Sequence, residues 1–456
     1  MSPAAISYSW ETAGEDVSPR PTARSHASVI RRAIAVADRR IPNPSINRSR
    51  NPAGARVLYL CYADIREPLI QSQVLPYLRG LSKGGLRMHL LTFQQSRVTA
   101  AERAAIRTAL RRDGLGWHSL RYHRKPSLPA TLFDIAAGAL VTFALCVRYR
   151  IRTIHARSHV PAAMAMVSKW ILGAKLIFDM RGLLAEEYVD AGRWRPGGLT
   201  YRLVKAMEQV FFRRADAIVM LTDAIRKELT AGPPLSTRQE VIEVIPCCAD
   251  VARFQAVNRE ASRSRFGWRD DLVLVYVGKV GTWYLPERMA EFFARLQRSD
   301  PRWFFAVFTQ AGAQLFQDAL ARAGVAQSRR LVTELQHEQV PEALVAADAG
   351  VSFIQPSYSK RASSPTKLGE YLAAGLPVVA NAGIGDSQPL IEESRVGVVL
   401  NDFTEQEYRR ATAGLGALLA DPDHGPRSRR VAEERLGLRT VGWPAYARVY
   451  ARIAAL

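Results

Sequence analysis

From residue 56 onward, short apolar segments of strand type alternate with segments of helical spacing, and this alternation constrains the fold most. Strand-type runs occupy residues 56–62, 88–93, 153–156, 175–179, 217–221 and 240–245. Continuous apolar strands that alternate with helices predict a parallel sheet covered on both faces. Ligands of such sheets bind at the carboxyl ends of the strands, so polar residues that follow the strands are the first candidates for a site.

The alternation stops once and then restarts, which indicates a second sheet. Residues 256–269 are polar and rich in Arg, and strand-type runs resume at 272–277, 303–309, 349–354, 378–380 and 396–400. A chain of 456 residues is long enough for two or three domains. We therefore predict an α/β protein with two successive domains and a cleft between them. Residues 1–53, rich in Ser, Pro and Arg, are predicted to be a disordered basic tail.

One apolar segment, residues 128–147, could be mistaken for a membrane span. Pro129 and Asp134 interrupt it, and the uninterrupted uncharged run of 135–147 is too short for a bilayer, which needs about 20 residues. We expect a buried helix here. The alternative is a helix that lies in a membrane interface, because basic residues flank the segment on both sides.

The formal net charge of +21 requires an explanation. Nucleic acid, an anionic membrane and an anionic substrate are the general possibilities. Residues 97–152 hold eleven basic and three acidic residues, and the tail holds eight Arg against four acidic residues. Only nine of the 63 basic residues are Lys, so an Arg-rich composition inflates the total. A basic segment beside an apolar helix favours an anionic membrane surface over nucleic acid, for which no motif is present.

Cysteine usage suggests the compartment. Cys61, Cys146, Cys247 and Cys248 form no C-x-x-C pair, and no apolar stretch follows basic residues near the N-terminus as in a secretory signal. We therefore expect reduced thiols and a cytoplasmic protein, associated peripherally with the inner face of the plasma membrane.

The stretch that carries most chemistry is SSPTKLGEYLAAGLPVVA, residues 363–380. Ser363, Ser364 and Thr366 are expected to cap a helix, and the free N–H groups of a helix N-terminus suit a phosphate. Lys367 lies in the first turn, where the helix dipole disfavours a cation unless an anion binds nearby. Glu370 can face the same site and accept hydrogen bonds from ribose hydroxyls. An ordinary capped surface helix is the competing interpretation.

PTKLGEYLAAGLPVVA (365–380) resembles the nucleotide-sugar-binding helix of retaining GT-B glycosyltransferases of the family 4 type. Further segments resemble the family in the same order along residues 56–455, namely 72–85, 154–165, 176–189, 244–254 and 275–289. The resemblance implies two Rossmann-like domains that face a central cleft. Residues 54–255 would form the acceptor domain and 256–438 the donor domain, with a helix in 439–456 that returns to the N-terminal domain.

The implied reaction is the transfer of a sugar, with retention, from a nucleotide-diphosphate sugar to a polysaccharide, glycolipid or lipid-linked oligosaccharide at the cytoplasmic membrane face. The resemblance also implies that no metal or other cofactor is required, and positive side chains and a helix dipole would then stabilise the leaving diphosphate. Three alternatives remain open. They are a nucleotide-sugar epimerase or hydrolase on the same fold, a non-enzymatic nucleic-acid-binding protein, and a catalytically dead scaffold. The sequence indicates no oligomeric state.

Strand ends and the resemblance together nominate the site residues. The catalytic candidates are His159, Lys279 and Lys367. The donor-binding candidates are Gly278, Gly281, Thr282, Ser363, Ser364, Thr366 and Glu370. The acceptor-side candidates are Arg157, Asp179 and Arg181. Trp283 and Tyr284 are expected to line the cleft.

The chain also departs from the family pattern. Ala362 stands where the family often has a Glu eight residues before the helix Glu, and Leu285 stands where a Lys is expected. Arg288, Lys360 and Arg361 are the candidates to replace these contacts.

Overall fold

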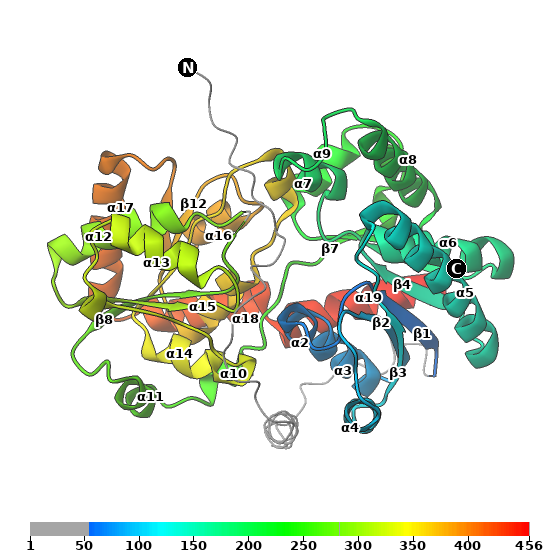
Figure 1. Ribbon diagram of the computed structural model, residues 1–456, viewed down its shortest axis with the longest axis horizontal. Helices are drawn as coiled ribbons and strands as arrows, with labels where there is room; N and C mark the ends of the chain where they lie inside the picture. The colour runs from blue at the N-terminus through cyan, green and yellow to red at the C-terminus, as the bar shows by residue number, and fades with distance from the viewer. Residues whose placement is uncertain (1–53, 282, 456) are drawn as a thin grey trace.

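The computed structural model describes residues 54–281 and 283–455, which form two α/β domains (Figure 1). Each domain has one parallel sheet, of seven strands in the N-terminal domain and six in the C-terminal domain. Helices cover both faces of each sheet, which confirms the predicted fold class. The predicted tail (1–53) and Thr282 lie outside the described residues.

In the N-terminal sheet the strand order is β3-β2-β1-β4-β5-β6-β7. The strands are β1 (Arg56–Cys61), β2 (Arg87–Gln94), β3 (Leu115–Arg121), β4 (Thr153–Arg157), β5 (Lys175–Asp179), β6 (Ala217–Met220) and β7 (Ile242–Val244). The helices are α2 (Pro68–Gln73), α3 (Leu75–Lys83), α4 (Ala100–Arg112), α5 (Ser127–Tyr149), α6 (His159–Leu172), α7 (Leu184–Asp190), α8 (Leu199–Arg214) and α9 (Asp223–Thr230).

In the C-terminal sheet the order is β10-β9-β8-β11-β12-β13. The strands are β8 (Leu272–Val277), β9 (Trp303–Phe308), β10 (Arg330–Thr333), β11 (Ala349–Ser352), β12 (Val378–Asn381) and β13 (Gly397–Leu400). The helices are α10 (Ala252–Gln255), α11 (Arg259–Phe266), α12 (Pro286–Ser299), α13 (Ala313–Arg322), α14 (Val340–Ala346), α15 (Thr366–Ala374), α16 (Ser387–Glu393), α17 (Glu405–Ala420), α18 (His424–Leu436) and α19 (Trp443–Ala454).

The period-2 alternation of side chains along each strand builds two separate cores in the N-terminal domain. Val57 and Tyr59 of β1 face the core under α2, α3 and α19, whereas Leu58 and Leu60 face the core under α5, α6 and α8. Both sets are buried, which is why the strands read as continuous apolar runs.

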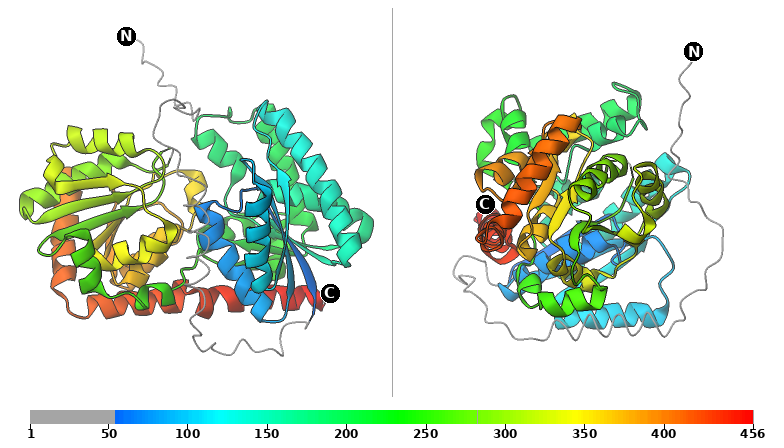
Figure 2. Two further views of the ribbon diagram at one scale, coloured as in Figure 1. Left: turned by 60° about the horizontal axis from the view of Figure 1, so that its bottom comes forward. Right: turned by 90° about the vertical axis from the view of Figure 1, so that its left-hand side faces the viewer.

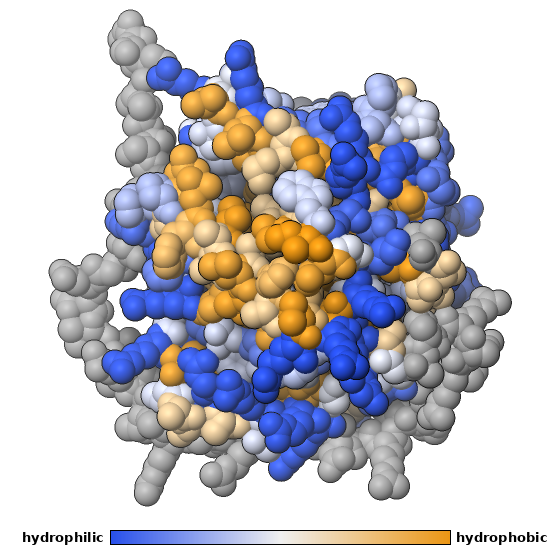
Figure 3. All heavy atoms as spheres, turned by 90° about the vertical axis from the view of Figure 1, so that its right-hand side faces the viewer, coloured by the Kyte–Doolittle hydropathy of each residue, from blue (hydrophilic) through white to orange (hydrophobic). Residues whose placement is uncertain are grey.

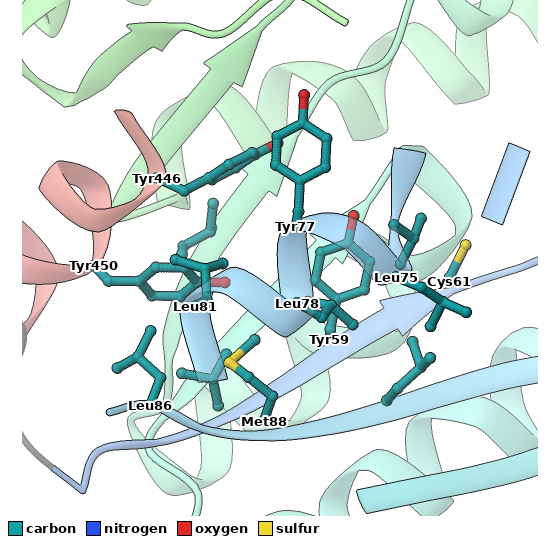
Figure 4. Close-up of a cluster of buried hydrophobic side chains, with 14 of the residues drawn as sticks. Tyr59, Cys61, Leu75, Tyr77, Leu78, Leu81, Leu86, Met88, Tyr446 and Tyr450 are labelled. Carbon is teal, nitrogen blue, oxygen red and sulfur yellow. The ribbon is translucent and has the colours of Figure 1, made fainter. Parts of the chain in front are cut away.

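The end of the chain crosses from the C-terminal domain to the N-terminal domain. After α18, a π-helical turn (Leu438–Gly442) leads into α19, and the helices run along one side of both domains (Figure 2). Tyr446 and Tyr450 of α19 pack beside Tyr77 and Leu78 of α3 (Figure 4). Trp443 donates a hydrogen bond through Nε1 to the Pro76 carbonyl at 3.1 Å.

Two strands, β3 and β10, have no counterpart in the sequence-based expectations. Each lies at an outer edge of its sheet, and several of their side chains are only half-buried. Edge strands carry fewer inward-facing residues, so they lack the continuous apolar signature of the central strands.

Helix α5 differs from the buried helix that we expected. It begins at Ser127 and extends over 23 residues, and Asp134 is buried, accepting hydrogen bonds from Tyr62 Oη (2.7 Å) and the His123 backbone N–H (3.0 Å). Within the described residues it is the one helix long and apolar enough to cross a membrane, yet it packs on the sheet with 39% of its most apolar window buried. Leu140 is 72% exposed, so the expectation of a buried helix is wrong for its outer face.

Candidate functional site

A cavity of about 370 Å³ lies between the two domains and defines the candidate site. The C-terminal domain contributes the ends of β8 and β9, the first turn of α15 and the loop before α14. The N-terminal domain contributes the start of α2. The lining side chains with polar groups are Glu67, Ser72, Lys279, Tyr284, Thr309, Gln310, His337, Thr366, Lys367 and Glu370.

Helix α15 directs its N-terminus at this cavity. Its N-cap is Pro365, and none of the described side chains caps it, so the expectation that Ser363, Ser364 and Thr366 act as caps is wrong. Thr366 is instead the first helical residue, and Ser364 Oγ accepts a hydrogen bond from the Cys247 N–H at 3.0 Å. The uncapped N–H groups of the first turn therefore remain available to an anion.

Lys367 is buried at the cavity wall, and no carboxylate of residues 54–281 and 283–455 is in contact with it. Its Nζ lies 3.4 Å from Tyr276 Oη and 3.5 Å from the ring centre of Tyr284. Burial holds the pKa of Lys367 well below its usual value, and Glu370 opposes this only in part. An anion in the cavity would restore the charge of this amine, so the lysine is placed to bind one.

Two glycines shape the loop after β8. Gly278 has a φ of 138°, and a Cβ at that position would lie 3.2 Å from Lys367 Nζ. Gly281 has a φ of 126°, which a residue with a side chain rarely adopts. Lys279 between them is exposed and lines the cavity. The loop therefore brings an exposed cation and backbone without side chains to the wall that carries Lys367.

Glu370 is a carboxyl group with an unusual proton affinity. Burial raises the pKa of Glu370 to about 7, against the opposing influence of Arg253 and Lys367. Arg253 Nη1 and Nη2 lie 2.9 Å from His337 Nε2 and the His337 carbonyl oxygen, respectively. Burial and this arginine lower the pKa of His337 to about 4, so the imidazole is neutral at pH 7.

The residues proposed to compensate for family departures have other partners. Lys360 pairs with Glu187 at 3.2 Å and Arg361 with Glu228 at 3.0 Å, both across the domain interface. Arg288 pairs with Glu291 on its own helix. None of the three basic residues lines the cavity.

Ala362 is 1% exposed and packs into the core of the N-terminal domain. A glutamate at position 362 would bury an unpaired charge in this apolar core. The packing therefore accommodates a small apolar residue such as alanine.

Two of the three acceptor-side candidates, Asp179 and Arg181, belong to a buried network under α19. Asp179 Oδ2 accepts a hydrogen bond from Tyr446 Oη at 3.2 Å and lies 3.3 Å from His155 Nε2, while Oδ1 lies 3.4 Å from Arg181 Nη1. Burial alone would raise the pKa of Asp179, but Arg181 and His155 hold it below its usual value. Neither Asp179 nor Arg181 lines the cavity, and Arg157 is also buried outside it.

His159 lies at the start of α6 and is 3% exposed. Its Nε2 is 3.0 Å from Glu208 Oε2, and its ring packs edge-on against Phe178. The preceding Ser158 has a φ of 75° at the turn from β4 to α6. The structure thus places His159 in the N-terminal core, and it does not bring this residue to the cavity with Lys367.

Sequence reasoning missed three parts of the cavity. Leu335 and His337 precede α14, Thr309 and Gln310 follow β9, and Glu67 to Ser72 supply the wall from the N-terminal domain. Thr309 and Gln310 lie at the carboxyl end of a buried strand, where parallel sheets bind their ligands, so the sequence could have identified them as site candidates. Glu67 also follows a strand-type run, that of residues 56–62, so its place at the ligand-facing edge could be read from the sequence, whereas its approach to the other domain could not.

Both halves of the chain match models of known protein families. Residues 70–248 match the family model described as glycosyl transferase 4-like domain, and residues 286–412 match that of the glucosyltransferase 3-like C-terminal domain. A D-inositol 3-phosphate glycosyltransferase from Nocardia farcinica is 29% identical over 214 residues, which is 45% of this chain. The match spans 44% of the length of that relative.

Solved structures show the same fold. A glycosyltransferase from Rickettsia africae superimposes with a TM-score of 0.65 at 14% identity, covering 88% of this chain and 99% of that one. Anabaena HepE in complex with UDP and glucose superimposes with a TM-score of 0.62 at 14% identity, covering 88% and 98%. At such identities the likeness establishes the two-domain fold.

Proposed function

Because this chain belongs to the family 4 type of glycosyltransferases with the GT-B fold, we propose that it transfers a sugar from a nucleotide-diphosphate donor to an acceptor in the interdomain cleft. The observation that carries the proposal is Lys367, a buried amine that no carboxylate of the described residues contacts, beside the uncapped N-terminus of α15. HepE was solved with UDP and glucose on the same fold, which supports a nucleotide sugar as the donor.

In this proposal the diphosphate lies against the first turn of α15. The N–H groups of that turn, Lys367 and the exposed Lys279 stabilise the negative charge that develops as the sugar leaves. Glu370 accepts hydrogen bonds from the ribose hydroxyls. The cations on this wall are the reason to expect transfer without a metal, and the family resemblance is the reason to expect retention at the anomeric carbon.

The acceptor is proposed to be a polysaccharide, a glycolipid or a lipid-linked oligosaccharide that enters from the N-terminal domain. The wall formed by Glu67 and Ser72 is the part of the cavity available for it. Proton NMR of the product would report the anomeric configuration, and an inverted product would contradict the retaining mechanism.

The proposal is tested first on the donor. A panel of nucleotide-diphosphate sugars is expected to raise the melting temperature of the protein for at least one member, because a ligand that binds the folded state stabilises it. Release of free sugar without acceptor, at a rate close to transfer, would favour a hydrolase or epimerase. Affinity for random duplex DNA with steep salt dependence, and no response to any nucleotide sugar, would favour the nucleic-acid-binding alternative.

The raised pKa of Glu370 predicts a pH dependence of donor binding. With a pKa of about 7, the carboxyl group of the empty site is protonated below pH 7 and must lose its proton to accept two ribose hydroxyls. Its contribution to UDP affinity is therefore expected to rise as the pH increases through about 7, by up to about tenfold per pH unit below that value. Calorimetric titration of UDP across this range measures it.

The matched variant is Glu370→Gln, which keeps the size of the side chain and removes the titration. Lys367 and the phosphates of UDP titrate in both proteins, so the difference between the two pH profiles isolates Glu370. Parallel profiles for the wild type and Glu370→Gln would contradict the assignment of this carboxyl group to the ribose.

A further inference from the structure

The outer face of α5 and the end of α6 form an exposed apolar surface, which we call the α5–α6 patch. Eight of the thirteen large apolar side chains that are exposed in the described residues belong to it. They are Leu128, Leu132, Phe133, Leu140 and Val147 on α5, and Trp170, Ile171 and Leu172 on α6. Figure 3 shows this side of the molecule as a broad apolar area bordered by hydrophilic residues. Soluble monomers rarely expose an apolar area this concentrated without a partner for it.

The patch follows from how the two helices pack. Helix α5 approaches α6 so closely that a Cβ on Gly138 would lie 2.5 Å from Met164 Sδ. Both helices lie on the same face of the N-terminal sheet, on the side away from the C-terminal domain (Figure 1). The inner face of α5, with Gly138, Thr142 and Cys146, is buried. The inner face of α5 makes its packing contacts with the protein, and the apolar residues of the outer face therefore stay exposed to solvent.

Basic residues stand at both ends of the patch. Arg148, Arg150 and Arg152 are exposed where α5 ends, close in sequence to Val147. Arg121 and Arg124 are exposed just before α5 begins. Within residues 54–281 and 283–455 no carboxylate pairs with Arg148, Arg150 or Arg152, so their charges are not neutralised by the described part of the protein.

We propose that the α5–α6 patch docks on the surface of a membrane that contains anionic lipid, with α5 lying in the interface plane. An apolar stripe with cations at its ends matches a hydrocarbon boundary covered by anionic headgroups. A second copy of the chain would bring the two sets of arginines together, which like-charge repulsion opposes. The basic tail, with eight Arg and four acidic residues, repels the same arginines. Charge complementarity therefore favours an anionic membrane, over a second copy of the chain or the basic tail, as the occupant of the patch.

Docking in this way would orient the interdomain cleft. The start of α5 follows the carboxyl end of β3, and the carboxyl ends of the strands form the sheet edge that faces ligands. The start of α5 would then be the end of the docked helix nearer to the ligand-facing edge of the sheet. This orientation rests on the proposed function, because it matters only if the acceptor is carried by a lipid, whereas the docking itself does not.

The test is vesicle flotation of the full chain with phosphatidylcholine alone and with roughly one third phosphatidylglycerol. The wild type is expected to float with the mixed vesicles. Phe133→Ser with Leu140→Ser should weaken that binding about tenfold or more, because two exposed apolar side chains lose their burial in lipid. Arg148→Gln with Arg152→Gln should weaken binding to the mixed vesicles by about tenfold and leave the weak binding to pure phosphatidylcholine unchanged.

The matched controls are on the C-terminal domain. Leu315→Ser, and Arg269→Gln with Arg298→Gln, change exposed residues of the same kinds and should float as the wild type does. All variants should keep the melting temperature and the UDP affinity of the wild type, which separates a failure of docking from a failure of the donor site. Brominated lipid is expected to quench fluorescence in the wild type more than in Trp170→Phe.

Three results would overturn the proposal. They are a wild type that does not float with the mixed vesicles, patch variants that float like the wild type, and a dimer in solution that Phe133→Ser with Leu140→Ser dissociates without any vesicle binding by the wild type. The last result would identify a second copy of the chain as the occupant of the patch.

Discussion

A Lys367→Met variant is expected to lose about 100- to 1000-fold in kcat/KM for sugar transfer, because it removes a buried cation from the place where the leaving diphosphate gains charge. The same variant should be at least as stable as the wild type. Lys367 is buried, and in the part of the chain that the structure describes no carboxylate contacts it, so a methionine of similar length relieves the cost of a desolvated amine. Opposite effects on activity and stability are typical of a group kept for function.

Steady-state kinetics with the donor identified by thermal shift would measure the first effect, and chemical unfolding the second. Lys227→Met is the matched control, since Lys227 is 72% exposed on α9 and pairs with Asp223 on its own helix. We expect the control to keep full activity. A Lys367→Met enzyme that transfers sugar at the wild-type rate would refute the proposed donor site.

An Asp179→Ala variant is expected to lower the free energy of unfolding by about 3–5 kcal/mol. Removal of this carboxylate leaves Arg181 as a buried cation without its ion-pair partner. It also removes the hydrogen-bond partner of His155 Nε2 and Tyr446 Oη. Because Tyr446 belongs to α19, the loss should also loosen the attachment of the C-terminal helix to the N-terminal domain. Urea unfolding, with hydrogen exchange of α19, would measure both effects.

Glu405→Ala is the comparison on the surface. Glu405 pairs with Arg295 and Arg409 but is 52% exposed, so its removal should cost at most about 1 kcal/mol. Similar losses for the two variants would show that the Asp179 network contributes no more than an exposed ion pair.

The central strands and helix α15 could be predicted from the sequence because their signals are local. Buried parallel strands must be apolar throughout, and β1, β5 and β8 were found where those runs stand. In the segment PTKLGEYLAAGLPVVA, a helix, its lysine and the following strand are all close in sequence. The edge strands β3 and β10 were missed because half-exposed strands mix polar and apolar residues.

The partners of each side chain depend on segments far apart in the chain, and no local pattern reports them. Ser364 was expected to cap its own helix, but its hydroxyl oxygen instead accepts a hydrogen bond from the Cys247 N–H of the N-terminal domain. Lys360 and Arg361 had the right charge and position for phosphate contacts, yet glutamates of the other domain pair with them. Glu67 came into the site because the two domains face each other across the cavity.

The sequence by itself determined the layered α/β architecture, the two-domain division of strands and the helix that holds Lys367 and Glu370, since apolar periodicity and short-range spacing depend only on neighbouring residues. Only the tertiary structure decided that Lys367 lies buried without contact to a carboxylate of the described residues, that Asp179 and Arg181 lie under α19, and that the outer face of α5 remains uncovered. Burial and ion pairing depend on which segments, distant in the sequence, pack together. That packing sets the electrostatic free energy of each charged side chain.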